Sequence, residues 1–150
     1  MKINKTIIFL AIIVMISCTF ANAFQTASAV QNKPKTADAS TSYITADELK
    51  TKIANNEQVC IVDLRGPTIY AQAEKTVKGA VHTKVRRVVY RLREIPRDQE
   101  VVVYCDCPSD EAAIIGARNL MAGGFKRVRV LKGGWNAWRQ VGGQMTPRPR

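Results

Sequence analysis

Three short runs rich in β-branched residues constrain the fold of this 150-residue chain most strongly. They are QVCIVDL at 58–64, EVVVYC at 100–105 and RVRVL at 127–131. Runs of this length that are apolar on both faces are typical of parallel strands buried between layers of helices. Segments with helical spacing alternate with them, so we predict an α/β fold. It has a central parallel sheet, helices on both faces and right-handed crossovers.

The segments between these strands carry helix signals. Thr45 stands three residues before Glu48, which is the spacing of a capping box. Apolar residues recur at helical spacing further along, and paired glycines end one of these stretches. The chain shows no internal repeat. We predict helical segments within 43–57, 85–95, 110–124 and 133–143.

Two cysteines, Cys105 and Cys107, lie one residue apart where the second strand stops and a helical pattern begins. Ligands of parallel sheets sit beyond the carboxyl ends of the strands, and Asp63 stands near the end of the first one. Unpaired N–H groups at such a junction favour an anion and lower the pKa of a thiol. This pattern predicts a nucleophilic cysteine. A buried thiol that merely ends the strand satisfies the same pattern equally well.

The residues that follow the cysteines are acidic rather than basic. No Arg or Lys stands between Cys105 and Arg118. A proline followed by Ser-Asp-Glu also has the composition of a helix start, with proline in the first turn. We expect the acids to raise the thiol pKa and to repel small dianions. The loop residues beside the thiols are Asp106, Pro108, Ser109, Asp110 and Glu111.

The first 23 residues have the layout of a secretory signal peptide. Lys2 and Lys5 precede an apolar run, and small residues flank a cleavage site after Ala23. The run is shorter than the roughly 20 residues of a comfortable membrane span. We therefore predict export, to the periplasm, with no stable membrane insertion after processing. An uncleaved anchor, or a lipoprotein anchored through Cys18, is the alternative.

The rest of the chain divides by composition. We assign 24–42 to a flexible linker of small polar residues, 43–145 to the folded domain and 146–150 to a basic tail. The chain carries a formal net charge of +11, and no acidic residue follows Glu111. Such a surface attracts anionic substrates, a membrane leaflet or an acidic partner. A solvated face with no dedicated partner accounts for it equally, and nothing indicates nucleic-acid binding.

Removal of Cys18 with the signal peptide leaves an odd number of cysteines, which argues against a disulfide scaffold. Cys60 lies inside a predicted strand and is expected to be a buried, inert thiol. We expect His82 to be structural or exposed. Trp135 and Trp138, three residues apart on the last helix, are packing residues first.

The chain resembles the rhodanese-like domain family from about Tyr43 to Met145. The matching stretches are IVDLR, VKGAVH, IPRDQEVVVYC and GGFKRVRVLKGGWNAW, in that order. The resemblance implies a single-domain sulfurtransferase fold. It implies a catalytic cysteine that takes a sulfane sulfur from a donor, holds it as a persulfide and passes it to an acceptor. It implies no cofactor, no metal and no catalytic histidine.

By position after VVVY, the resemblance places the nucleophile at Cys105. Counting back from the helix places it at Cys107, in a loop that is two residues longer. We favour Cys105 and keep Cys107 as a neighbour, a resolving thiol or an alternative nucleophile. In the family, the residues matching Asp63 and Arg65 mainly organise the loop by hydrogen bonds.

The loop departs from the common pattern of the family, which has glycine and a basic residue. The phosphatase and arsenate-reductase relatives need an arginine about six residues after the cysteine, where this chain has Glu111 or Ala113. Phosphatase chemistry is therefore not expected. Thiosulfate is a dianion and suits this loop poorly. A persulfide or polysulfide, or a persulfide carrier protein, is the expected partner.

The residues of the loop also fit two other functions. The first is a thiol redox protein whose Cys105 and Cys107 cycle through a disulfide. The second is a catalytically inactive rhodanese-fold module that binds a partner, or holds Cu(I) between the two thiolates. The sequence contains no information on the oligomeric state.

Overall fold

The computed structural model describes residues 41–149. The predicted signal peptide (1–23), the alternative lipid anchor at Cys18 and most of the predicted linker (24–42) lie outside the described residues. No helix in the described part is long and apolar enough to cross a membrane.

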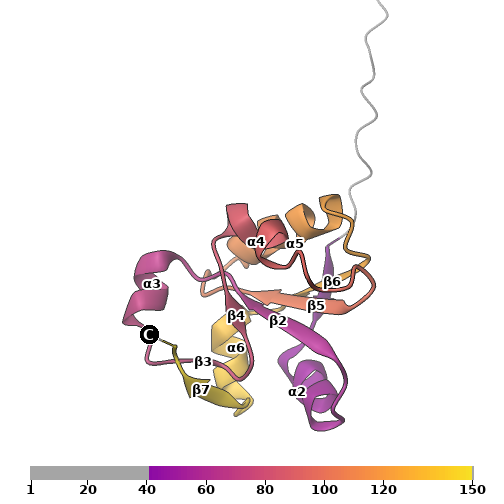
Figure 1. Cartoon of the computed structure of the whole chain (residues 1–150). Coiled ribbons are helices and arrows are strands. Elements are labelled where there is room, and N and C mark those ends of the chain that lie inside the picture. The colour runs from indigo at the N-terminus through magenta and orange to yellow at the C-terminus, as the bar shows by residue number, and fades with distance from the viewer. Residues whose placement is uncertain (1–40, 150) are drawn as a thin grey trace, which may run out of the picture. The chain divides into compact units, whose positions relative to one another are not determined.

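A five-stranded parallel sheet forms the centre of the fold, with strand order β1-β6-β5-β2-β4 (Figure 1). This arrangement confirms the predicted α/β class. The three runs identified in the sequence occupy the three middle positions of the sheet. The strands are β1 (Ser42–Ile44), β2 (Val59–Asp63), β4 (Val81–His82), β5 (Glu100–Tyr104) and β6 (Arg127–Leu131).

Helices cover both faces of the sheet because its central strand is apolar on both sides. Val101 and Val103 of β5 pack toward one face and Val102 and Tyr104 toward the other, and all four are fully buried. The first face carries the 3₁₀ turn η1 (Val85–Arg87), α4 (Val88–Arg91) and α5 (Glu111–Ala122). The second carries α2 (Ala46–Ala54) and α6 (Gly134–Gln140). Figure 1 shows α4 and α5 above the sheet and α2 and α6 below it.

The local signals predicted most elements and missed others. The capping box forms, since Thr45 N donates to Glu48 Oε2 at 2.7 Å and Glu48 N donates to Thr45 Oγ1 at 3.2 Å. The predicted 85–95 helix is only η1 and the single turn α4. Pro108 is not in the first turn of a helix, because α5 begins at Glu111 and Pro108 lies in the turn before it.

A second, two-stranded sheet joins distant parts of the chain. β3 (Lys75–Val77) pairs antiparallel with β7 (Met145–Pro147), so that Thr146 and Pro147 of the sequence-defined tail take part in strand pairing. Arg148 continues the contact, with its N–H on Glu74 O at 2.9 Å. α3 (Pro67–Gln72) precedes β3. These short elements were not predicted because they show no periodicity of their own.

Candidate functional site

The carboxyl ends of β2 and β5 define one edge of the sheet. The two strands are parallel neighbours, with Asp63 opposite Tyr104 in the register. Cys105 follows Tyr104 directly and begins the loop that leads to α5. The fold therefore brings the predicted residues Asp63, Arg65 and Cys105 to one edge.

The two thiols of the loop are in direct contact. Cys107 Sγ donates a hydrogen bond to Cys105 Sγ at 2.8 Å, and the backbone N–H of Cys107 points at the same sulfur at 3.4 Å. The backbone N–H of Ala113, in the first turn of α5, also forms a hydrogen bond with Cys105. Cys105 is fully buried, whereas Cys107 is partly exposed.

Burial, followed by the hydrogen bond with Cys107, raises the pKa of Cys105 to about 12. The N–H groups of Cys107 and Ala113 act in the opposite direction, as the sequence predicted for the end of a strand before a helix. They do not outweigh burial. The described conformation is therefore one in which Cys105 is a protonated thiol at neutral pH.

Asp110 anchors the loop rather than facing the thiols. It adopts a left-handed backbone conformation, with φ of 54°, and is buried. Its Oδ2 accepts the N–H of Gly133 at 2.9 Å, while the carbonyl of Cys105 accepts the N–H of Trp135 at 2.9 Å. The Gly133–Gly134 turn thus holds both ends of the cysteine loop. Of the loop residues we singled out, Asp106, Pro108, Ser109 and Glu111 are exposed.

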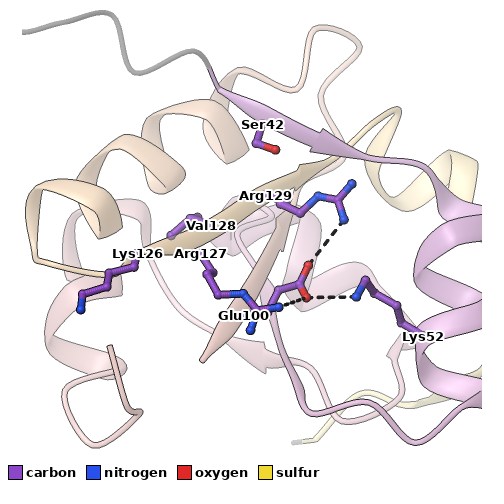
Figure 2. A pocket seen from close by; sticks show the side chains of 7 residues that line it. All are labelled: Ser42, Lys52, Glu100, Lys126, Arg127, Val128 and Arg129. Carbon is purple, nitrogen blue, oxygen red and sulfur yellow. Dashed lines mark hydrogen bonds and ion pairs between the residues drawn. The ribbon is translucent and has the colours of Figure 1, made fainter. Parts of the chain in front are cut away.

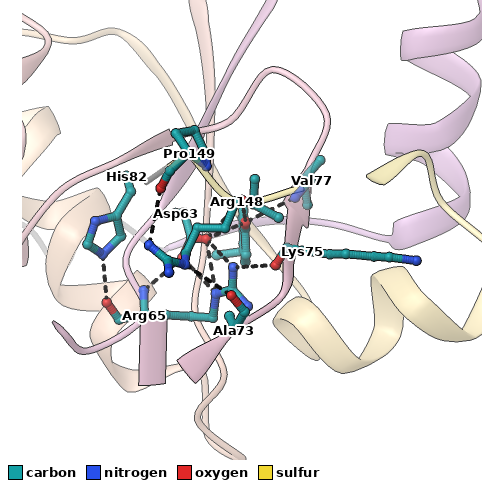
Figure 3. A network of polar contacts seen from close by, with 10 residues as sticks. Asp63, Arg65, Ala73, Lys75, Val77, His82, Arg148 and Pro149 are labelled. Atoms are coloured by element: carbon teal, nitrogen blue, oxygen red, sulfur yellow. Dashed lines mark hydrogen bonds and ion pairs between the residues drawn. The ribbon is translucent and has the colours of Figure 1, made fainter. Parts of the chain in front are cut away.

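A buried ion pair supports the same edge of the sheet (Figure 3). Arg65 Nη2 lies 2.6 Å from Asp63 Oδ2 and also donates to the carbonyl of Lys75. Tyr104 donates its hydroxyl hydrogen to Asp63 Oδ2 at 2.7 Å. Burial disfavours the charged guanidinium, but the hydrogen bonds and charge of Asp63 outweigh it, so the pKa of Arg65 is raised. The side-chain hydrogen bonds of this pair run to Lys75, Thr76 and Tyr104. That the pair also organises the cysteine loop stays a prediction.

Other residues singled out in the sequence have packing contacts. The ring of His82 stacks on Tyr70 with centroids 3.5 Å apart, and its Nε2 lies 3.1 Å from the carbonyl oxygen of Arg65. The Arg65 guanidinium lies 4.5 Å from the centre of the Trp135 ring, and Trp138 is fully buried. Burial raises the pKa of the Cys60 thiol.

A pocket of about 530 Å³ opens beside Cys107. Its lining includes the apolar residues Leu64, Pro67, Val85 and Ala112. A second pocket of about 340 Å³ adjoins it, since both share Val85, Arg86, Cys107 and Ala112. The larger pocket has a basic border of three exposed residues, Lys84, Arg86 and Arg87, while the fourth basic residue of its lining, Arg65, is buried in its ion pair with Asp63.

The basic border was not predicted. The run KVRR at 84–87 was visible in the sequence, but its helical spacing indicated only a polar helix face. Within residues 41–149, Lys84, Arg86 and Arg87 have no hydrogen-bonding or ion-pairing partner for their side chains. They are exposed cations beside the one partly exposed thiol of the loop.

Another basic pocket lies at the opposite edge of the sheet (Figure 2). It has a volume of about 350 Å³ and lies at Glu100 and Arg127, the first residues of β5 and β6. Lys52, Arg127 and Arg129 all pair with the buried carboxylate of Glu100. These three cations are held in ion pairs within the fold, and no cysteine lines this pocket. The described residues also include no cluster of three metal-ligating side chains.

A parallel sheet covered on both faces, with a cysteine loop at the carboxyl ends of its strands, defines an α/β domain with a candidate cysteine nucleophile. The rhodanese-like domain pattern matches residues 45–141, and the chain belongs to this family.

Similar proteins agree with this assignment. A sulfurtransferase of Allochromatium vinosum is 33% identical over 99 residues, which cover 66% of this chain and 89% of that protein. The Alr3790 protein of Anabaena sp. has a similar crystal structure, with a TM-score of 0.61 and 27% identity over 69% of this chain and 80% of that one. A thiosulfate sulfurtransferase of Pseudomonas aeruginosa shares the fold, with a TM-score of 0.60 and 23% identity. The match covers 69% of this chain and 19% of that protein. The family match and the Allochromatium vinosum relative support a sulfurtransferase-type function.

We predict that Gly134→Ala destabilises the protein by about 2 kcal/mol more than Gly142→Ala, because an overpacked contact typically costs about 1–3 kcal/mol. Both glycines have a left-handed φ, 49° and 61°, so the backbone strain is shared. Only at Gly134 does an added Cβ run into the carbonyl of Cys105, whereas Gly142 has open space. Urea unfolding of the two variants measures the difference, and equal free energies of unfolding would show that the turn does not clamp the loop.

Proposed function

We propose that this chain is an exported rhodanese-type sulfurtransferase that carries sulfane sulfur as a persulfide on Cys105. One observation carries the proposal. Cys105 Sγ stands at the carboxyl end of β5, where backbone N–H groups of the loop and of α5 converge on it. Such donors stabilise a sulfur anion once it forms. Export is proposed from the layout of residues 1–23.

The reaction begins when the Cys105 thiolate attacks the outer sulfur of a donor R–S–SH. The bond between the two donor sulfurs breaks, R–S⁻ leaves and takes up the proton that Cys105 lost on forming the thiolate, and Cys105–S–SH remains. A nucleophilic acceptor then takes the outer sulfur and regenerates the thiol. Because Cys107 Sγ covers Cys105 in the described conformation, the Cys107 side chain turns toward the 530 Å³ pocket to admit the donor.

The choice of Cys105 over Cys107 remains a prediction. The backbone hydrogen bonds favour Cys105 as the position that holds the persulfide. Exposure favours Cys107 as the thiol that the donor meets first, since only Cys107 lines the pockets. Removal of Cys107 uncovers Cys105 and removes a hydrogen bond that raises the pKa of Cys105. If Cys105 is the nucleophile, the Cys107 variant therefore still takes up sulfur, whereas the Cys105 variant does not.

The pocket favours an extended anionic donor over a small one. Asp106 and Glu111 are exposed on the loop and repel a dianion placed directly at the thiols. Lys84 and Arg86 border the pocket at a position suited to a carboxylate carried further along the donor. An organic persulfide with a carboxylate tail, or a persulfide on an acidic carrier protein, meets both conditions. Thiosulfate meets neither.

We predict that reduced Cys107→Ala protein gains one sulfur atom on exposure to inorganic polysulfide and that Cys105→Ser protein gains none. The double variant Cys60→Ala/Cys107→Ala is the matched control and gains one sulfur atom like Cys107→Ala, because Cys60 lies inside β2. Intact mass followed by peptide mapping of the alkylated protein measures the gain. If only the Cys107 variant fails to take up sulfur, Cys107 rather than Cys105 carries the persulfide. No uptake in any form would leave a binding module.

We also predict that the double variant Lys84→Glu/Arg86→Glu lowers kcat/KM for a carboxylate-bearing organic persulfide by about tenfold at low salt, and by less at high salt. The reversed charges repel the carboxylate from the pocket border. Lys78→Glu/Lys126→Glu makes the same change in net charge at two exposed positions that do not line this pocket, and should have little effect. Equal losses in both double variants would show that only net charge matters.

A further inference from the structure

The contact between the two loop thiols joins two atoms that can bond to each other. Cys107 Sγ lies 2.8 Å from Cys105 Sγ, which becomes the inner sulfur once Cys105 carries a persulfide. We propose that Cys107 resolves this persulfide, so that the loop reduces sulfane sulfur to sulfide and closes a Cys105–Cys107 disulfide. The inference rests on the proposed function only in that Cys105 takes up the sulfur.

The step balances without any additional reactant. Cys107 Sγ attacks Cys105 Sγ, the bond from Cys105 Sγ to the outer sulfur breaks, and the electron pair leaves with that sulfur. The departing hydrosulfide takes the proton of Cys107 and is released as H₂S. The sulfane sulfur is reduced by two electrons, and the two cysteines are oxidised to a disulfide. An external dithiol, of a protein or a small molecule, then reduces the disulfide and resets the loop.

The geometry favours attack on the inner sulfur. The Sγ–Sγ separation has to shorten from 2.8 Å to about 2.05 Å, which is within the reach of a side-chain adjustment in a loop. Attack on the outer sulfur would instead move that sulfur from Cys105 to Cys107 and would form no disulfide. The released hydrosulfide has an exit, because Cys107 lines the 530 Å³ pocket.

Groups around the two thiols hold Cys105 Sγ in place and attract the leaving hydrosulfide. The backbone N–H groups of Cys107 and Ala113 hold Cys105 Sγ in place while Cys107 approaches it. Lys84 and Arg86 at the pocket border attract the hydrosulfide anion as it leaves. Cys60, the third cysteine of the described residues, is buried within β2 and has no hydrogen bond to either loop thiol.

The test is a single turnover without reductant. Fully reduced full-length protein is exposed to polysulfide for a short time, desalted, and assayed for released sulfide and for intact mass. We expect wild type and Cys60→Ala to release about one sulfide per chain and to finish two hydrogens lighter than the reduced protein. Cys107→Ala should retain the added sulfur and release sulfide only after an external thiol is supplied.

Three results would overturn the inference, and they differ from one another. Wild type that keeps its added sulfur for as long as Cys107→Ala shows that the persulfide is carried but not resolved. Peptide mapping that finds the sulfur on Cys107 of the wild type shows transfer to the outer position instead. If wild type, Cys60→Ala and Cys107→Ala all take up no sulfur, the result contradicts the proposed sulfurtransferase function itself.

Discussion

The buried ion pair of Asp63 and Arg65 is the interaction on which the site depends. Both side chains are almost fully buried, at 0% and 3% exposure, and they link the end of β2 to β3, β5 and α6. Breaking a buried pair by removing one partner typically costs about 3–5 kcal/mol, because an unpaired charge is left inside. The pair therefore fixes the edge of the sheet from which the cysteine loop leaves.

That fixed edge sets the chemistry of the loop through two opposing effects. Burial under Cys107 keeps Cys105 protonated, while backbone N–H groups stand ready for an anion on the same sulfur. Movement of one side chain, that of Cys107, shifts the balance between them. The acidic residues that we expected to repel anions from the loop fall into two groups. Asp110 is an internal anchor on Gly133, whereas Asp106 and Glu111 remain at the surface.

The fold was largely predictable because β2, β5 and β6 carry apolar runs, and the capping box of α2 is a local signal. The family resemblance placed Asp63, Arg65 and Cys105 in one site, and the register of β2 and β5 sets Asp63 beside Tyr104, the residue before Cys105. The tertiary contacts were not predictable. The sequence left the burial of Cys105 open as one of two alternatives. The hold of Asp110 on Gly133 and the basic pocket border depend on residues distant in sequence. The pairing of β3 with β7 does so as well.

The most direct measurement is a crystal structure of Cys107→Ala protein soaked with an organic persulfide. The proposed chemistry predicts one additional sulfur bonded to Cys105 Sγ, with the Cys105 sulfur still held by the backbone N–H groups of residue 107 and Ala113. It also predicts an unmodified Cys60. A soaked structure in which Cys105 stays an unmodified thiol, or in which the added sulfur is found on Cys60, would contradict Cys105 as the sulfur carrier.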